Sequence, residues 1–221
     1  MNQPSTVAPT GGKTRKLVLQ ILFGAITGGV MTFLTLNAIE GRGFDLDNPS
    51  RVIALLIGLV FVLMGLFVGL GVAMPGAGSH LLNVEDEAEL REQRRPLWRS
   101  AAVVLLMGAM MLALAFAGAG DWAGLLSPKT AAIVVGGCIL GTSVLSYLAR
   151  NDNDELMRSI AREGAAWGMY ACLAIFTVWG SLAHLGFAPW ITPLGLVSAL
   201  LAILLIAIFT VCGVRGVLKP R

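Results

Sequence analysis

Residues 189–215, PWITPLGLVSALLAILLIAIFTVCGVR, carry no charged side chain before Arg215. About 20 consecutive apolar residues are enough for a helix to cross the hydrocarbon core of a bilayer, so this stretch predicts a membrane span. The whole chain has the same character: it is 56% hydrophobic and 13% charged, with a mean hydropathy of +0.79. Soluble domains carry about 25% charged residues. The sequence therefore predicts an all-α integral membrane protein.

Five further stretches are as long and apolar, which predicts a bundle of six transmembrane helices. The predicted spans are residues 17–38, 52–74, 101–119, 129–149, 165–186 and 191–212. They are flanked by tails at 1–16 and 213–221 and joined by charged loops at 75–100 and 150–164. Loops 120–128 and 187–190 are short, so the spans on either side of each form helical hairpins.

The distribution of basic residues predicts the orientation of the bundle. Lys and Arg concentrate in the cytoplasmic loops of membrane proteins, and only Arg42, Arg51 and Lys129 fall on the opposite side here. We therefore expect a bacterial inner membrane protein with both termini in the cytoplasm. Trp98, Trp122 and Trp190 lie next to span ends, where tryptophan anchors helices at the headgroups.

Two segments resemble each other at an offset of 65 residues. When residues 124–150 are placed over 189–215, Ser127-Pro128 falls on Thr192-Pro193 and Arg150 falls on Arg215. The first predicted hairpin shows this Ser/Thr-Pro start more weakly, with Pro49-Ser50 before its second span. This pattern indicates three duplicated helical hairpins, although any two apolar helices with a Ser/Thr-Pro start would align similarly.

Glycines recur at four-residue spacing on four of the predicted spans. Such spacing lets helix backbones approach closely in lipid. We expect these glycines to pack helices within the chain, and an oligomer interface stays open for the first two spans. The helix-packing candidates are Gly24, Gly28, Gly65, Gly69, Gly137, Gly141, Gly164 and Gly168.

The two charged loops are candidate docking surfaces. Residues 83–100, NVEDEAELREQRRPLWRS, mix acids with arginines, and Glu87 and Arg91 have the favourable helical i,i+4 order. Residues 150–167 predict a helix that continues unbroken into the fifth span. Mixed charge suits a polar protein contact, where charges set register and association rate, and the simpler interpretation is a solvated connector. The candidate docking residues are Glu87, Arg91, Arg94, Arg95, Arg158 and Arg162.

The sequence offers little catalytic or metal-binding chemistry. No Asp, Glu, Lys or Arg lies in the centre of a span, where such residues usually mark ion pathways. Ser181 and His184 have no convincing orienting acid, and the three cysteines are isolated in apolar runs. We predict no catalytic residues, no metal site, no cofactor and no nucleic-acid partner.

Two functional hypotheses follow. The first is a non-enzymatic accessory subunit of a larger membrane assembly, whose partners are the lipid bilayer and homo- or hetero-oligomeric membrane proteins. The alternative is a small transporter or channel for a neutral or amphipathic solute. That pathway would be lined by polar groups of the first and fourth spans: Gln20, Thr27, Thr32, Thr35, Thr142, Ser143 and Ser146. Back-bonding to the preceding turn is the simpler role for the hydroxyls.

Overall fold

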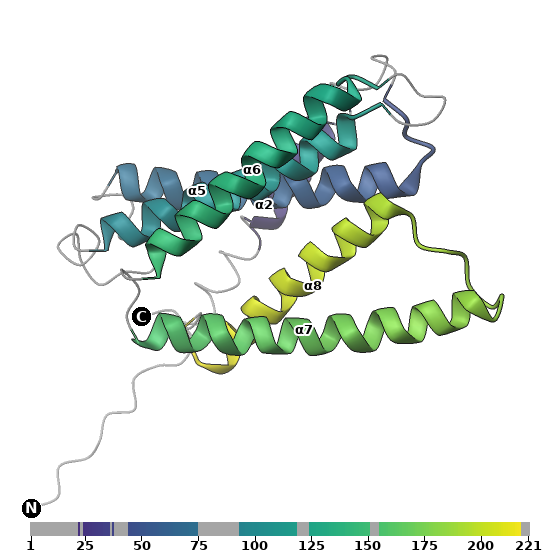
Figure 1. Cartoon of the computed structure of the whole chain (residues 1–221). Coiled ribbons are helices and arrows are strands. Elements are labelled where there is room, and N and C mark those ends of the chain that lie inside the picture. Colours follow the sequence, from purple (N-terminus) through teal and green to yellow (C-terminus); the bar gives the residue numbers. More distant parts are fainter. Residues whose placement is uncertain are drawn as a thin grey trace, which may run out of the picture.

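The computed structural model describes residues 22, 24–35, 37, 44–74, 93–118, 124–150 and 155–217. Within these ranges the chain is helical, without a β-strand. The helices long and apolar enough to cross a membrane are α2 (Pro49–Ala73), α5 (Arg94–Phe116), α6 (Pro128–Ala149), α7 (Glu155–His184) and α8 (Pro193–Val214) (Figure 1). A shorter apolar helix covers Gly24–Thr35.

The all-α prediction is thus confirmed, and five of the predicted spans correspond to long apolar helices. The first predicted span, 17–38, lies partly outside the described residues, as do the two tails. One helix begins earlier than predicted. α5 includes Arg94 and Arg95, which were assigned to loop 75–100, because Pro96 falls in its first turn, where a missing N–H costs little. α7 begins at Glu155 and continues without a break, as expected.

Three helices begin with the same local structure. Asn48, Ser127 and Thr192 are N-caps, and each is followed by a proline that begins the helix. The side-chain oxygens of these caps accept hydrogen bonds from backbone N–H groups of Ser50, Thr130 and Gly195 at 3.0–3.2 Å. A capped N–H and a pre-set proline φ both favour helix initiation, so the sequence itself sets these three boundaries.

Consecutive helices run in opposite directions. Arg51 at the start of α2 contacts the end of α5, and Arg99 at the start of α5 contacts Leu148 at the end of α6. One end of the molecule therefore carries the starts of α2, α6 and α8, and we refer to it as the N-cap end. The opposite end, the arginine end, carries the starts of α5 and α7.

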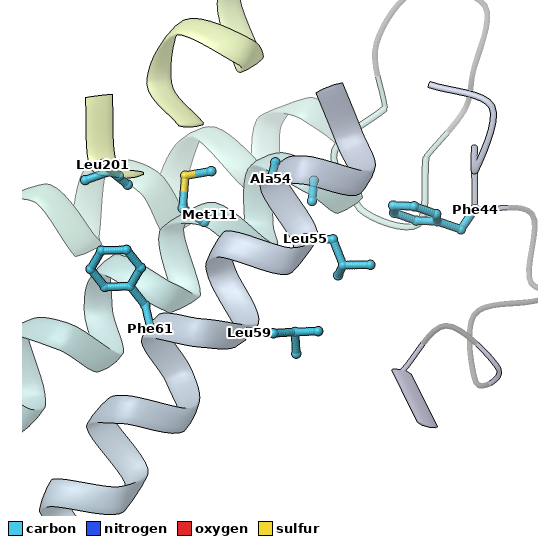
Figure 2. Close-up of a cluster of buried hydrophobic side chains, with 8 residues drawn as sticks. Phe44, Ala54, Leu55, Leu59, Phe61, Met111 and Leu201 are labelled. Atoms are coloured by element: carbon cyan, nitrogen blue, oxygen red, sulfur yellow. The ribbon is translucent and has the colours of Figure 1, made fainter. Parts of the chain in front are cut away.

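The centre of the fold is the contact between α2 and α5. The buried cluster comprises Phe44, Ala54, Leu55, Leu59, Phe61, Met111, Ala115 and Leu201, drawn from α2, α5, α8 and the segment before α2 (Figure 2). Close contacts at two glycines, Gly108 and Gly65, bring the backbones of α2 and α5 together. A Cβ on Gly108 of α5 would lie 2.8 Å from the backbone nitrogen of Val62, and a Cβ on Gly65 of α2 would lie 3.1 Å from the carbonyl oxygen of Ala101.

The outer helices have few neighbours. α6 packs mainly against α5, and α7 packs mainly against α8. α8 joins the rest of the bundle chiefly through α2, and at the N-cap end the hydroxyls of Ser50 and Thr192 lie 2.7 Å apart. In Figure 1 the α7–α8 pair accordingly forms an arm that diverges from α2, α5 and α6.

A paired cysteine substitution tests this contact between α2 and α8. We expect Ser50→Cys/Thr192→Cys to form an intramolecular disulfide on mild oxidation in membranes, because the two hydroxyl oxygens already lie 2.7 Å apart. The measurement is the loss of two maleimide-reactive thiols by mass spectrometry. Ser50→Cys alone is the control, and two thiols that stay reactive after oxidation would contradict the placement of α8 against α2.

Arg51 differs from its sequence assignment. The sequence predicts Arg51 in the polar segment 40–51 that precedes the span at 52–74, whereas it lies in the first turn of α2 and only 6% of it is exposed. Its Nη1 donates hydrogen bonds to the carbonyl oxygens of Ala115 (3.3 Å) and Ala117 (2.8 Å), and its Nε lies 3.6 Å from Asp45 Oδ2. The guanidinium thus binds the carbonyl oxygens at the end of α5, where the helix dipole favours a cation.

Candidate anion-binding site

A polar cavity of about 970 Å³ lies at the arginine end, between the last turn of α6 and the first turns of α7. From the end of α6 come Ser146, Tyr147 and the C-cap residue Arg150. The residues contributed by α7 are Glu155, Arg158, Ala161 and Arg162. The cavity therefore forms where the chain leaves one predicted span and enters the next.

Helix geometry directs the charged residues to the same side. Glu155, Arg158 and Arg162 are three and four residues apart on α7, which places them on one face. Ser146 and Arg150 are likewise four residues apart on α6. Among the described residues, the cavity thus collects three guanidinium groups and one carboxylate from two helices that contribute little contact to each other.

These three arginines make no ion pair or side-chain hydrogen bond with any residue in the described ranges. Other arginines do have protein partners. Arg215 on α8 donates to Glu163 Oε2 at 2.6 and 3.0 Å, and Arg99 donates to the carbonyl oxygen of Leu148 at 2.9 Å. The described residues that line the cavity therefore carry an excess of positive charge. Their guanidinium groups are exposed and can bind an oxyanion in a bidentate manner.

The length of α7 places the cavity near a membrane surface. A helix of 30 residues is about 45 Å long at roughly 1.5 Å per residue, whereas the hydrocarbon core is about 30 Å thick. The charged first third of α7 therefore has to extend beyond the core if the apolar remainder spans it. Tyr147 and Trp167 are 73% and 61% exposed on the flanking helices, as expected for aromatic side chains near headgroups.

The structure separates the predicted docking residues into two groups. Arg158 and Arg162 line the cavity, and Arg94 and Arg95 are exposed in the first turn of α5. Glu87 and Arg91 lie outside the described residues. Arg150, Tyr147 and Glu155 are not candidate site residues by sequence, and Ser146 is a candidate only for the solute pathway. The available signal was the pair of arginines, Arg150 and Arg158, on either side of the boundary between two predicted spans.

Five of the predicted packing glycines lie at contacts between helices. Gly65 and Gly69 face Leu105 and Trp98 of α5, Gly141 faces Leu106, and Gly164 and Gly168 face Ile208 and Leu204 of α8. A Cβ on Gly24, Gly28 or Gly137 would meet nothing within 4 Å. Gly58 and Gly108 are not among the predicted packing glycines, because they are not separated by four residues but lie on different helices.

The predicted tryptophan anchors differ in exposure, and two hydroxyls of the predicted spans are hydrogen-bonded within their own helices. Trp98 and Trp190 are 40% and 72% exposed, and Trp122 lies outside the described residues. The hydroxyls of Thr35 and Ser143 donate to carbonyl oxygens one turn earlier, at 2.7 and 2.8 Å. These bonds fit the back-bonding interpretation.

Ser181 and His184 do not form a nucleophile–base pair. The Ser181 hydroxyl donates to the carbonyl oxygen of Thr177 at 2.8 Å, so its proton is directed along the helix. In the part of the chain that the structure describes, no group of three or more His, Cys, Asp or Glu residues is placed to hold a metal ion. The arginine-lined cavity is therefore the strongest candidate site among the described residues.

Comparison with known protein-family models, with curated proteins and with solved structures gives no significant match to this chain.

Proposed function

We propose that the chain is a non-enzymatic, multi-pass accessory subunit of a larger assembly in a bacterial inner membrane. The arginine end and both termini face the cytoplasm in this proposal, in accord with the positive-inside rule. The observation that carries it is the set of exposed arginines without protein partners at that end. Three other arginines of the described chain, Arg51, Arg99 and Arg215, do have such partners.

Arg94 and Arg95 are the residues we assign to the protein contact. They lie at the start of a regular helix, are exposed, and make no ion pair with a described residue. Because the adjacent segment contains both acids and arginines, a partner with a complementary charge pattern would bind in one register. Rim charges of this kind chiefly affect the association rate.

The outer helices supply apolar surface for such an assembly. α6 and α7 each pack mainly against one helix, and large apolar side chains are exposed on both, including Leu140 at 69% and Tyr170 at 67%. Lipid covers such surfaces in a monomer. In the proposed assembly, helices of the partner replace part of that lipid, and the unoccupied faces of Gly24, Gly28 and Gly137 allow close approach.

The test is co-purification from gently solubilised membranes. We expect Arg94→Glu/Arg95→Glu to reduce the yield of stoichiometric partner proteins at least several-fold without lowering the amount of folded chain, because the exchange replaces attraction with repulsion. The measurement is the native mass of the complex together with the identity of every co-purifying protein.

Arg158→Gln/Arg162→Gln and Lys129→Glu are the controls, because the first pair lies in the cavity and Lys129 is exposed at the N-cap end. A native chain that purifies as a bare monomer would overturn the proposal and redirect effort to solute transport.

A further inference from the structure

We propose that the cavity between α6 and α7 binds the phosphate-containing headgroup of an anionic phospholipid, with the acyl chains lying along the exposed apolar sides of these two helices. The inference uses Arg150, Arg158 and Arg162. It does not depend on the protein contact at Arg94 and Arg95, so either proposal can fail alone.

The headgroup part rests on the chemistry of the cavity lining. Three guanidinium groups and the hydroxyls of Ser146 and Tyr147 are hydrogen-bond donors, and Glu155 is the single carboxylate among the described residues that line the cavity. Guanidinium groups match the geometry of phosphate oxygens. None of these arginines is paired with a described carboxylate, so an anionic headgroup would displace no ion pair within the described part of the chain.

The acyl-chain part rests on the residues that follow the arginines along each helix. On α7, Met169 lies seven residues after Arg162, and Leu173 follows four residues later on the same side. They are 60% and 58% exposed. On α6, Leu140 lies seven residues before Tyr147 and is 69% exposed. Both helices therefore change from polar to apolar in the same direction, away from the cavity.

The change from charged to apolar side chains along α6 and α7 matches the structure of a phospholipid at a membrane surface. A charged group at one end and an apolar surface leading from it correspond to a headgroup and its acyl chains. Basic pockets between transmembrane helices on the cytoplasmic side are suited to anionic headgroups. A soluble phosphate would use only the arginines, and a contact with the apolar sides of α6 and α7 would then have no role.

The experiment measures lipid binding to the purified full-length chain by native mass spectrometry in detergent. The probe is phosphatidylglycerol, and phosphatidylcholine with the same acyl chains is the neutral comparison. We expect phosphatidylglycerol to bind the native chain and Arg158→Gln/Arg162→Gln to weaken that binding about tenfold or more, since charge-assisted Arg–phosphate contacts are removed. Arg158→Lys/Arg162→Lys keeps the charge, and we expect it to retain more of the binding than the glutamine variant.

Arg94→Gln/Arg95→Gln is the matched control, because it removes the same charge from the same end of the molecule but outside the cavity lining. Equal weakening in this control would overturn the site, as would equal binding of phosphatidylcholine by the native chain. Displacement of phosphatidylglycerol by millimolar inorganic phosphate would show a free-anion site and overturn the lipid assignment. Circular dichroism and gel filtration of each variant verify that folding is unchanged.

Discussion

Replacing Arg51 with methionine is expected to lower the free energy of unfolding by about 2–4 kcal/mol, among the largest effects of any single substitution in this chain. Methionine keeps an unbranched side chain but removes the hydrogen bonds to the carbonyl oxygens of Ala115 and Ala117. It also leaves Asp45 without the guanidinium that lies 3.6 Å away. The measurement is unfolding by SDS titration in mixed micelles, followed by circular dichroism.

Two further substitutions separate the Arg51 contact from a general effect of positive charge. Arg51→Lys keeps the charge but not the planar fork of donors, so we expect an intermediate loss of stability. Lys129→Met removes an exposed cation at the same end of the molecule and should change stability by less than about 0.5 kcal/mol. Arg51→Met with the stability of the native chain would mean that the α5 carbonyl oxygens do not depend on Arg51.

Gly108→Ala is expected to lower the free energy of unfolding by about 1–3 kcal/mol, because the added methyl group overpacks the contact between α2 and α5. The new Cβ would lie 2.7 Å from Val62 Cγ2, 2.8 Å from the Val62 backbone nitrogen and 3.0 Å from the Gly58 carbonyl oxygen. Two of these three atoms belong to the backbone of α2. Side-chain rotation therefore cannot relieve the overlap, and the helices have to separate.

The control for Gly108→Ala is the same change at Gly137, where a Cβ meets nothing within 4 Å. Alanine is the better helix former by about 1 kcal/mol, so Gly137→Ala should leave stability unchanged or raise it. The same SDS titration measures both variants. A Gly108→Ala variant as stable as Gly137→Ala would show that α2 and α5 do not approach this closely.

The helices were largely predictable because their signals are local. Long apolar runs define the spans, and Ser127-Pro128 and Thr192-Pro193 indicate helix starts, which the structure confirms as capped first turns. The start of α5 was less predictable. Its first turn is charged, and a charged helix that leaves the bilayer has the same composition as a loop.

The arrangement of the helices could not be predicted from such signals. Hydropathy does not state which apolar helix packs against which, and the Gly58–Gly108 contact joins residues on different spans. Arg51 was assigned to a polar loop because three of its near neighbours in sequence are Asp45, Asp47 and Asn48. A cation in the first turn of a helix is unfavourable because the helix dipole is positive there. This unfavourable position was the one local sign that Arg51 makes a specific contact.

The candidate site contains residues that were predictable from the sequence and residues that were not. Arg158 and Arg162 were identified from the charge pattern of one loop, whereas Arg150 and Tyr147 join them only because α6 and α7 bring their ends together. A turn between two helices places such residues near one another in space, but it does not say on which side of each helix they lie. That information came from the structure.

The sparse contacts of α7 have a consequence for biogenesis. A helix that packs mainly against its successor in the chain makes its helix–helix contacts only after that successor has been synthesised. We therefore expect α7 and α8 to pack together as one late unit, after α2 and α5 have formed their glycine-lined contact. For the same reason, α7 should be the first of the long helices to exchange its amide hydrogens in the native protein.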